Sequence, residues 1–200
     1  MIKKKVSILL IMTMAIQIGL SIGTALHAKD AEILLTEEEA IHYIFSGIAE
    51  IKRDTRILPT EQWQKLNEIL KKEYNSYLEK NLDTKFNFFI GFSASGEVSH
   101  YALIDVVPGK WGPITYVIGI TPEGKVKDLA VMNYLEKRGR PVKERRFLDQ
   151  FVTKCLSDPL KLRNDIKGIS GATISSRGMV NGIKKALALV DVFYIKKRTL

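Results

Sequence analysis

Four consecutive strand-forming segments set the architecture expected for this chain. They are rich in aromatic and β-branched residues, they are separated by turn-forming residues, and they cover 86–92, 98–107, 114–120 and 125–132. Short connections of this kind join neighbouring antiparallel strands. Helical patterns lie before and after the four segments. The sequence therefore predicts an α+β fold, in which an antiparallel sheet is flanked by N-terminal and C-terminal helices.

The helical pattern before the sheet begins with a capping box. Thr36 and Glu39 have the spacing of that motif, and apolar residues follow at helical intervals, so a helix is expected from Thr36 to about Arg53. A second helix is expected after Pro59. These two helices define an N-terminal helical region over 29–82, and a third helix is expected beyond the sheet, with Phe147, Leu148, Phe151, Val152 and Cys155 on one face.

Residues 1–28 have the pattern of a secretory signal. Three lysines at positions 3 to 5 precede the apolar run 6–26, and Ala-Leu-His-Ala at 25–28 supplies small residues for cleavage. An uncleaved membrane anchor is the alternative, because about 20 apolar residues are enough to span a bilayer. Both interpretations place the domain outside the cytoplasm, in the periplasm or at the outer face of the cytoplasmic membrane.

The chain is basic, with a net charge of +9. Without the three N-terminal lysines, 28 basic residues stand against 22 acidic ones, which leaves +6. Export and the lack of interleaved aromatic and basic residues argue against nucleic acid as a partner. Six basic residues between Lys137 and Arg146 form either a solvated surface or a docking site for an anion or an acidic redox partner. No histidine has metal-ligand spacing, so no metal site is expected.

A loop of small and hydroxyl residues precedes the last helical pattern. Residues 168–176 read Gly-Ile-Ser-Gly-Ala-Thr-Ile-Ser-Ser, and a helix is expected from Ser176 to about Tyr194, with Ser175 or Ser176 as N-cap. The exposed N–H groups and the dipole of a helix start favour an anion such as phosphate. Most loops of this kind bind only water, which is the alternative. The stretch lacks the lysine of a P-loop and the last glycine of a nucleophile elbow.

The motif Ser170-Gly171-Ala172-Thr173, followed by Ile174-Ser175-Ser176, resembles the flavin-attachment motif of the FMN-binding domain family. Further motifs occur in the order that the family shows: Gly109-Lys110-Trp111-Gly112-Pro113-Ile114, Glu123-Gly124, Glu136-x-x-Gly139 and Phe147-Leu148-Asp149-Gln150-Phe151. This family includes the C subunit of the sodium-pumping NADH:quinone reductase and the G subunit of the Rnf ferredoxin complex. The resemblance covers roughly residues 86–190 and makes 83–195 the expected FMN-binding domain.

The resemblance implies that Thr173 carries FMN through a phosphoester. A separate flavin transferase, with FAD as donor and magnesium as its cofactor, would install it. The other expected cofactor-binding residues are those of the same loop and three further ones: Ser170, Gly171, Ala172, Ser175, Ser176, Trp111, Glu136 and Gly139. Trp111 either packs on the flavin ring or lies in the core. The resemblance thus indicates an electron carrier or a subunit of a membrane electron-transport complex rather than a stand-alone enzyme.

One residue departs from the family pattern. The family has aspartate six residues before the modified threonine, whereas this chain has Lys167, with Asp165 two residues further upstream. The alternative is therefore a non-covalent flavin-binding or flavin-free interaction module of the same fold. A hydrolase built on Ser170 is a third interpretation, for which only His42 and His100 could serve as base, and neither has a spacing that ties it to Ser170.

Overall fold

The computed structural model describes residues 32–58, 66, 85–135 and 140–195. The chain divides after Glu32 into two units, and the fold lies in the second, Ile33–Leu200. The predicted signal segment lies outside the described residues, as does almost all of the helix expected after Pro59. Within the described ranges, no helix is both long and apolar enough to cross a membrane.

Six strands of the described ranges form one sheet, in the order β1-β6-β5-β4-β3-β2. They are β1 (Glu32–Ile33), β2 (Glu50–Ile57), β3 (Lys85–Phe92), β4 (Val98–Pro108), β5 (Pro113–Ile120) and β6 (Val126–Tyr134). Each pairing from β2 to β6 is antiparallel and joins strands that are consecutive in the sequence. The four predicted strands correspond to β3–β6. The predicted α+β fold with its antiparallel sheet is confirmed.

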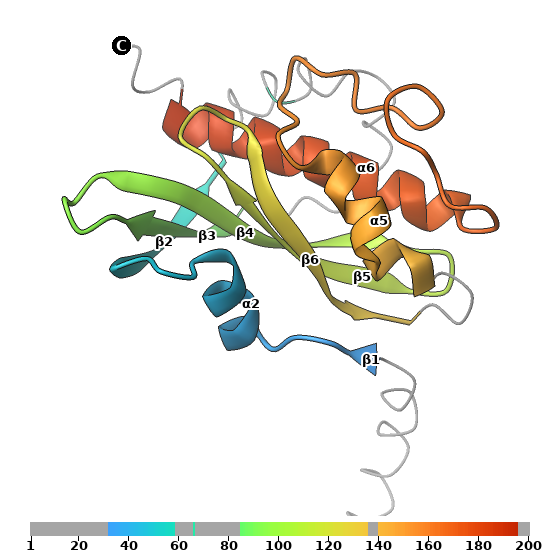
Figure 1. Cartoon of the computed structure of the whole chain (residues 1–200), viewed down its shortest axis with the longest axis horizontal. Helices are drawn as coiled ribbons and strands as arrows, with labels where there is room; N and C mark the ends of the chain where they lie inside the picture. The colour runs from blue at the N-terminus through green and yellow to red at the C-terminus, as the bar shows by residue number, and fades with distance from the viewer. Residues whose placement is uncertain (1–31, 59–65, 67–84, 136–139, 196–200) are drawn as a thin grey trace, which may run out of the picture. The chain divides into compact units, whose positions relative to one another are not determined.

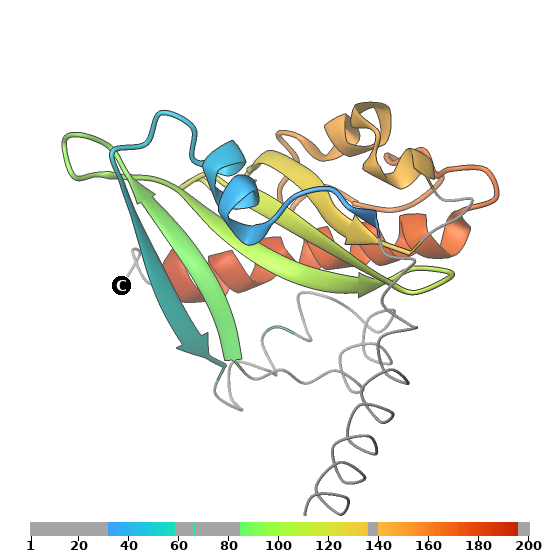
Figure 2. The ribbon, with the colours of Figure 1, turned by 90° about the horizontal axis from the view of Figure 1, so that it is seen from below.

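Helices cover both faces of the sheet (Figures 1 and 2). On one face lies α2 (Glu37–Ile44), and on the other lies α6 (Thr173–Val190), which continues into the π-helical turn η4 (Asp191–Ile195). Alternation along β4 produces the two layers, because Ala102 packs with the α2 side whereas Tyr101 and Leu103 belong to the larger core that includes α6. Three short helices follow β6: η2 (Arg140–Lys143), α5 (Arg145–Leu148) and η3 (Asp149–Phe151).

The helix after the capping box is shorter than predicted. The box itself is present, since the Thr36 N–H donates to the Glu39 carboxylate (2.8 Å) and the Glu39 N–H donates to Thr36 Oγ1 (3.2 Å). Helix α2 nevertheless ends at Ile44, and Gly47, with a φ of 76°, turns the chain into β2. Because β2 pairs with β3 along its whole length, tertiary pairing outweighs the local helical pattern. The prediction of a helix to Arg53 is wrong.

The helix expected around Phe147 is also broken up. The chain is helical only from Arg145 to Phe151, as α5 and η3. Beyond that point the main chain bonds to the start of β6: the Thr153 N–H donates to the Val126 carbonyl, and the Val126 N–H donates to the Lys154 carbonyl, both at 2.8 Å. These bonds draw the segment out of the helix. The prediction that helix continues to Cys155 is therefore wrong.

Candidate functional site at the start of helix α6

Helix α6 begins at Thr173, three residues before the predicted start at Ser176. Its N-cap residue is Ala172, which makes no side-chain capping bond. Ser175 and Ser176 lie inside the first turn, and both are fully buried. The prediction that one of these two serines caps the helix is wrong.

The two buried serines tie separate loops to the helix. The Ser176 hydroxyl accepts a hydrogen bond from the Ile169 N–H (3.1 Å), which fixes the loop just before α6. The Ser175 hydroxyl accepts from the Lys110 N–H (3.3 Å), which fixes the loop between β4 and β5. Buried polar groups require such hydrogen-bond partners, so the hydroxyl groups of both serines serve to hold the fold together.

Of the four hydroxyl residues in 168–176, Ser170 and Thr173 are exposed. Thr173 is the first residue of an 18-residue helix, where N–H groups lack a carbonyl one turn earlier and the dipole favours negative charge. Gly171 precedes it with a φ of 76°, and a Cβ built there meets no atom within 4 Å. The space beside Gly171, two residues before Thr173, is therefore open.

The loop between β4 and β5 is a tight turn, closed by the Gly109 N–H donating to the Gly112 carbonyl at 2.8 Å. The Trp111 side chain is 57% exposed, and the Lys110 ammonium lies 5.4 Å from the centre of its ring. This exposure excludes the alternative that Trp111 packs in the core. Its predicted contact with a flavin ring stays a prediction.

Helix α6 lies directly on the end of β4 because two of its residues have no side chain. A Cβ at Gly178 would lie 2.2 Å from the Pro108 carbonyl oxygen, and one at Gly182 would lie 2.4 Å from Val107 Cγ1. Further along the helix, the Lys185 ammonium pairs with the Asp105 carboxylate at 2.7 Å, and both side chains are largely buried. These contacts fix which side of α6 faces the sheet and which faces outward.

Lys167, the residue that departs from the family pattern, is exposed, and its main chain is bound by Gln150. The Lys167 N–H donates to Gln150 Oε1 (2.8 Å), and Gln150 Nε2 donates to the Lys167 carbonyl (3.3 Å). The side-chain amide of Gln150 thus bonds to both the N–H and the carbonyl group of Lys167. These bonds make no use of the lysine side chain.

Asp165, two residues upstream of Lys167, is bound within its own loop. Its carboxylate accepts the N–H groups of Leu160 (3.1 Å) and Lys161 (2.8 Å) and pairs with the Lys154 ammonium at 3.2 Å. Although burial opposes the effect, the Lys161 N–H and the Lys154 ammonium hold the pKa of Asp165 below its usual value. The carboxylate therefore serves the loop that precedes Lys167.

The remaining predicted residues lie apart from this site or outside the described ranges. Glu136 and Gly139 belong to 136–139, one of the gaps between those ranges. His100 is fully buried between the sheet and α2, with its ring stacked on Phe45 at 4.5 Å. It lies on the face opposite to α6, so it cannot act as a base for Ser170.

Three comparisons with known proteins agree with one another. Residues 109–188 match the family model of the FMN-binding domain. The G subunit of the proton-translocating ferredoxin:NAD(+) oxidoreductase complex of Clostridium ljungdahlii is 26% identical over 167 residues, which cover 77% of this chain and 82% of that protein. The crystal structure of Shewanella oneidensis NqrC shares the fold, with a TM-score of 0.56 at 17% identity over 84% of this chain and 91% of that one. The predicted family resemblance is confirmed, and FMN is confirmed as the cofactor of this type of domain.

Proposed function

We propose that this chain, whose residues 109–188 match the FMN-binding domain model, is an exported flavoprotein that carries electrons, with FMN attached to Thr173. The family match supports the cofactor. One observation supports the attachment residue: Thr173 is exposed at the start of α6, whereas Ser175 and Ser176 are buried and bonded to neighbouring loops. Ser170 is exposed too, but it lies in the loop, outside the helix.

Attachment uses the Thr173 hydroxyl as a nucleophile towards FAD held by a flavin transferase. The Thr173 oxygen bonds to the phosphorus on the FMN side of FAD and loses its proton, while the pyrophosphate bond breaks and AMP leaves. The N–H groups and dipole of the α6 start favour the charge that stays on the phosphate. Once bound, FMN supplies reversible electron transfer, and the protein supplies attachment, orientation and local charge.

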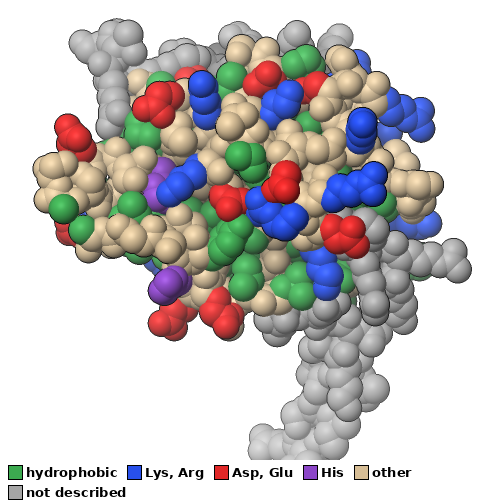
Figure 3. All heavy atoms as spheres, viewed as in Figure 1, with side chains coloured by type: hydrophobic (Ala, Val, Ile, Leu, Met, Phe, Trp, Pro, Cys, Tyr) green, Lys and Arg blue, Asp and Glu red, His purple; other side chains and the backbone are tan. Residues whose placement is uncertain are grey.

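The proposed partners are the flavin transferase and a membrane electron-transport complex. The similar Clostridium protein is named as a subunit of such a complex. Besides the buried Lys185, which pairs with Asp105, residues 159–190 contain five Lys or Arg residues and one acidic residue. On the face shown in Figure 3, Lys and Arg side chains lie among acidic ones. An acidic partner surface suits this charge, because complementary potentials speed association. Export rests on the signal-like segment 1–28.

Co-expression with a flavin transferase tests the attachment. After denaturation, the wild type is expected to remain yellow and fluorescent and to gain the mass of one FMN less one water. Thr173→Ala should lose this signal, while Ser170→Ala, the matched change at the other exposed hydroxyl, should keep it. A colourless wild type refutes covalent attachment, and colour lost on denaturation supports non-covalent binding instead.

A non-covalent flavin-binding or flavin-free module of the same fold is the second candidate, and Lys167 favours it. If a transferase requires aspartate at this position, Lys167→Asp should raise the labelled fraction. The change should leave the fold intact, because Gln150 bonds only to the main chain there. Arg163→Asp, an equal change of charge at a nearby exposed position, is the control. Equal labelling of the wild type and Lys167→Asp would show that the lysine does not matter.

A further inference from the structure

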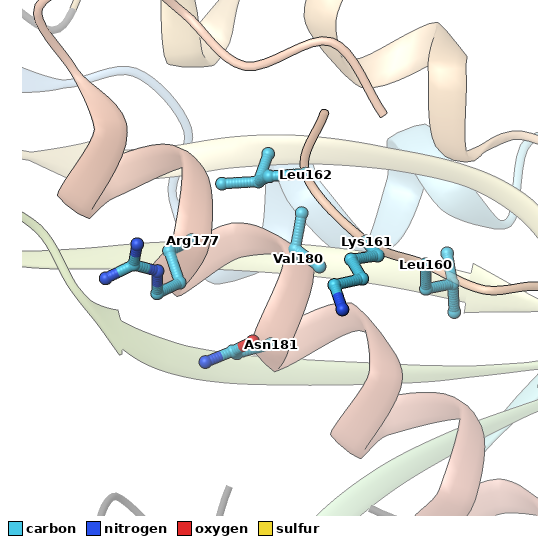
Figure 4. Close-up of a pocket in the computed structure, with 6 residues that line it drawn as sticks. All are labelled: Leu160, Lys161, Leu162, Arg177, Val180 and Asn181. Atoms are coloured by element: carbon cyan, nitrogen blue, oxygen red, sulfur yellow. The ribbon is translucent and has the colours of Figure 1, made fainter. Parts of the chain in front are cut away.

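A charged hollow of about 420 Å³ lies between helix α6 and the segment 160–162. Figure 4 shows the six residues that line it: Leu160, Lys161, Leu162, Arg177, Val180 and Asn181. Leu160 and Val180 form its buried base, with only 2% and 4% of their surface exposed. Lys161 and Arg177 are exposed. In this α6 pocket, as we call it, a ligand therefore meets two cations, the Asn181 amide and the half-buried Leu162.

Two further cations flank the α6 pocket. Arg163 directly follows Leu162 in the loop. Lys167 precedes Gly168, where a Cβ would lie 3.5 Å from Leu162 Cδ2. Both cations are exposed. With the two cations of the pocket they form what we call the α6 basic surface, which consists of Lys161, Arg163, Lys167 and Arg177.

Among the residues that the structure describes, no acidic side chain neutralises the α6 basic surface. The side chains of its four cations form no hydrogen bond or ion pair within this part of the chain. Other cations do pair with carboxylates, as Arg53, Arg56, Arg145, Lys154 and Lys185 show. The one carboxylate of the segment 159–168 is that of Asp165, and it pairs with Lys154 at 3.2 Å. The α6 basic surface therefore keeps a positive potential.

The loop that carries three of these cations is held in shape by its own bonds. Leu160 and Arg163 adopt φ values of 44° and 65°, in the left-handed region that side chains other than glycine rarely take. The Asp165 carboxylate accepts the N–H groups of Leu160 and Lys161. The Arg163 N–H donates to the Ile166 carbonyl at 2.9 Å. Strained residues that their surroundings hold in place are concentrated at functional sites, and a loop fixed in advance lowers the entropy cost of binding.

We infer that the α6 basic surface docks an acidic segment of the protein that exchanges electrons with this chain, and that one carboxylate of that segment enters the α6 pocket. A carboxylate suits the polar groups of the pocket, because guanidinium and ammonium groups form strong charge-assisted bonds with it and the Asn181 amide can donate another. The inference deepens the proposed function and rests on it for the exchange of electrons. Arg177 is one turn, about 6 Å along the axis, from Thr173, so a partner bound here lies close to the residue proposed to carry FMN.

A protein segment suits this surface better than a membrane does. Peripheral membrane binding combines cations with apolar side chains that enter the lipid. None of the large apolar side chains exposed in the described part of the chain lines the α6 pocket; these are Tyr43, Ile51, Ile57, Val106, Trp111 and Ile174. The cations moreover surround a hollow, which can receive a projecting side chain.

Binding of an octaglutamate peptide to the chain without FMN, followed by amide NMR at low salt, tests the docking surface. The peptide is expected to shift the resonances of residues 160–167 and 177–181, and rising ionic strength should weaken its binding. Lys161→Gln and Arg177→Gln should each raise the dissociation constant severalfold. Lys125→Gln, which removes an exposed cation that does not line the α6 pocket, should leave it unchanged. Equal constants in all four proteins, or shifts confined to other residues, overturn the inference.

Co-sedimentation with phosphatidylglycerol vesicles tests a membrane as the alternative partner. Lys161→Gln and Arg177→Gln are expected to sediment with the vesicles to the same extent as the wild type. If both variants lose vesicle binding while octaglutamate leaves the amide resonances of the wild type unchanged, the surface binds lipid and the inference is wrong.

Oxidation of the reduced, flavinylated chain by ferricyanide, an anionic acceptor, tests the link to electron transfer. Reduced FMN gives its electron pair to a pair of ferricyanide ions and releases its protons. Lys161→Gln and Arg177→Gln should slow this reaction severalfold at low salt, because they weaken the attraction of the anion. Oxidation by benzoquinone, a neutral acceptor, should keep its rate. Equal ferricyanide rates in the variants and the wild type overturn the role of the surface in electron transfer.

The peptide experiment separates this inference from the proposed function, because it uses the chain without FMN. A wild type that binds octaglutamate through Lys161 and Arg177 but never carries FMN supports the docking surface and contradicts the attachment at Thr173. A wild type that carries FMN but does not bind the peptide overturns the docking surface and leaves the attachment standing.

Discussion

His100 is expected to make the stability of the fold depend on pH between about 6.5 and 4. Its ring is fully buried, lies 4.5 Å from the Phe45 ring, and has Nε2 at 2.9 Å from the Ile44 carbonyl oxygen. Burial, assisted by the Lys127 charge, lowers the pKa of His100 from 6.5 to about 4. The unfolded chain therefore binds more protons than the folded one in this range. The stability that neutral His100 provides is complete above pH 6.5 and is lost as the pH falls towards 4.

The magnitude follows from the two pKa values. Each pH unit between 6.5 and about 4 corresponds to about 1.4 kcal/mol, so the loss amounts to about 3 kcal/mol. Domains are typically stable by about 5–15 kcal/mol, so this loss is a substantial part of the total. The structural consequence should be concentrated at α2, because the imidazole lies against Ile44 and Phe45.

Urea unfolding between pH 7 and 4 measures this effect in the wild type, His100→Gln and His42→Gln. Glutamine does not titrate, and its amide can still donate to the Ile44 carbonyl. The difference in unfolding free energy between the wild type and His100→Gln should therefore change by about 3 kcal/mol across the range, to the disadvantage of the wild type at low pH. His42 is exposed, so His42→Gln should follow the wild type. Parallel curves for the wild type and His100→Gln would refute the reasoning.

Three further substitutions should change the free energy of unfolding, as measured in urea at pH 7. Gly178→Ala should cost about 1–3 kcal/mol, because the new Cβ would lie 2.2 Å from the Pro108 carbonyl oxygen; no loss would mean that α6 can shift away from β4. Lys185→Met should cost about 3–5 kcal/mol, because the Asp105 carboxylate loses its ammonium partner. Adding Asp105→Leu should recover most of this loss. If the losses from the two substitutions simply add, the two residues are not coupled. Thr36→Ala should cost about 1 kcal/mol through loss of the capping box, and an unchanged midpoint would show that the cap contributes nothing.

The sequence predicts the central sheet well because β3–β6 are rich in aromatic and β-branched residues and have clear turns between them. It misses β2, whose residues Glu50–Ile57 are mostly charged or polar and follow directly on a helical pattern. That strand exists because β3 offers a partner along its whole length. The paired residues of β2 and β3 lie from 28 (Ile57 and Lys85) to 42 (Glu50 and Phe92) positions apart, so their contact leaves no local signal. The capping box at Thr36, by contrast, is local and is confirmed.

The same difference between local motifs and long-range contacts applies to the candidate site. The motif points to Thr173, but spacing alone makes Ser175 and Ser176 look like helix caps, because a hydroxyl before a helical pattern usually is one. In the fold, their partners are the N–H groups of Lys110 and Ile169, one of them on a distant hairpin. The α6 pocket, lined by Arg177, Val180, Asn181 and residues 160–162, has only a faint signal in the sequence, because its three helical residues recur at helical spacing. The loop that covers them becomes evident only in three dimensions.

The exposure of Thr173 has a consequence for the order of events during maturation. A hydroxyl at the surface of a completed helix can be modified after the chain has folded, whereas modification of Ser175 or Ser176 would require the first turn of α6 to open. If FMN is attached at Thr173, as proposed, its loading can therefore come after the chain has folded. A transferase would then act on chains that have already folded, so the presence of the flavin would indicate that a chain had folded correctly.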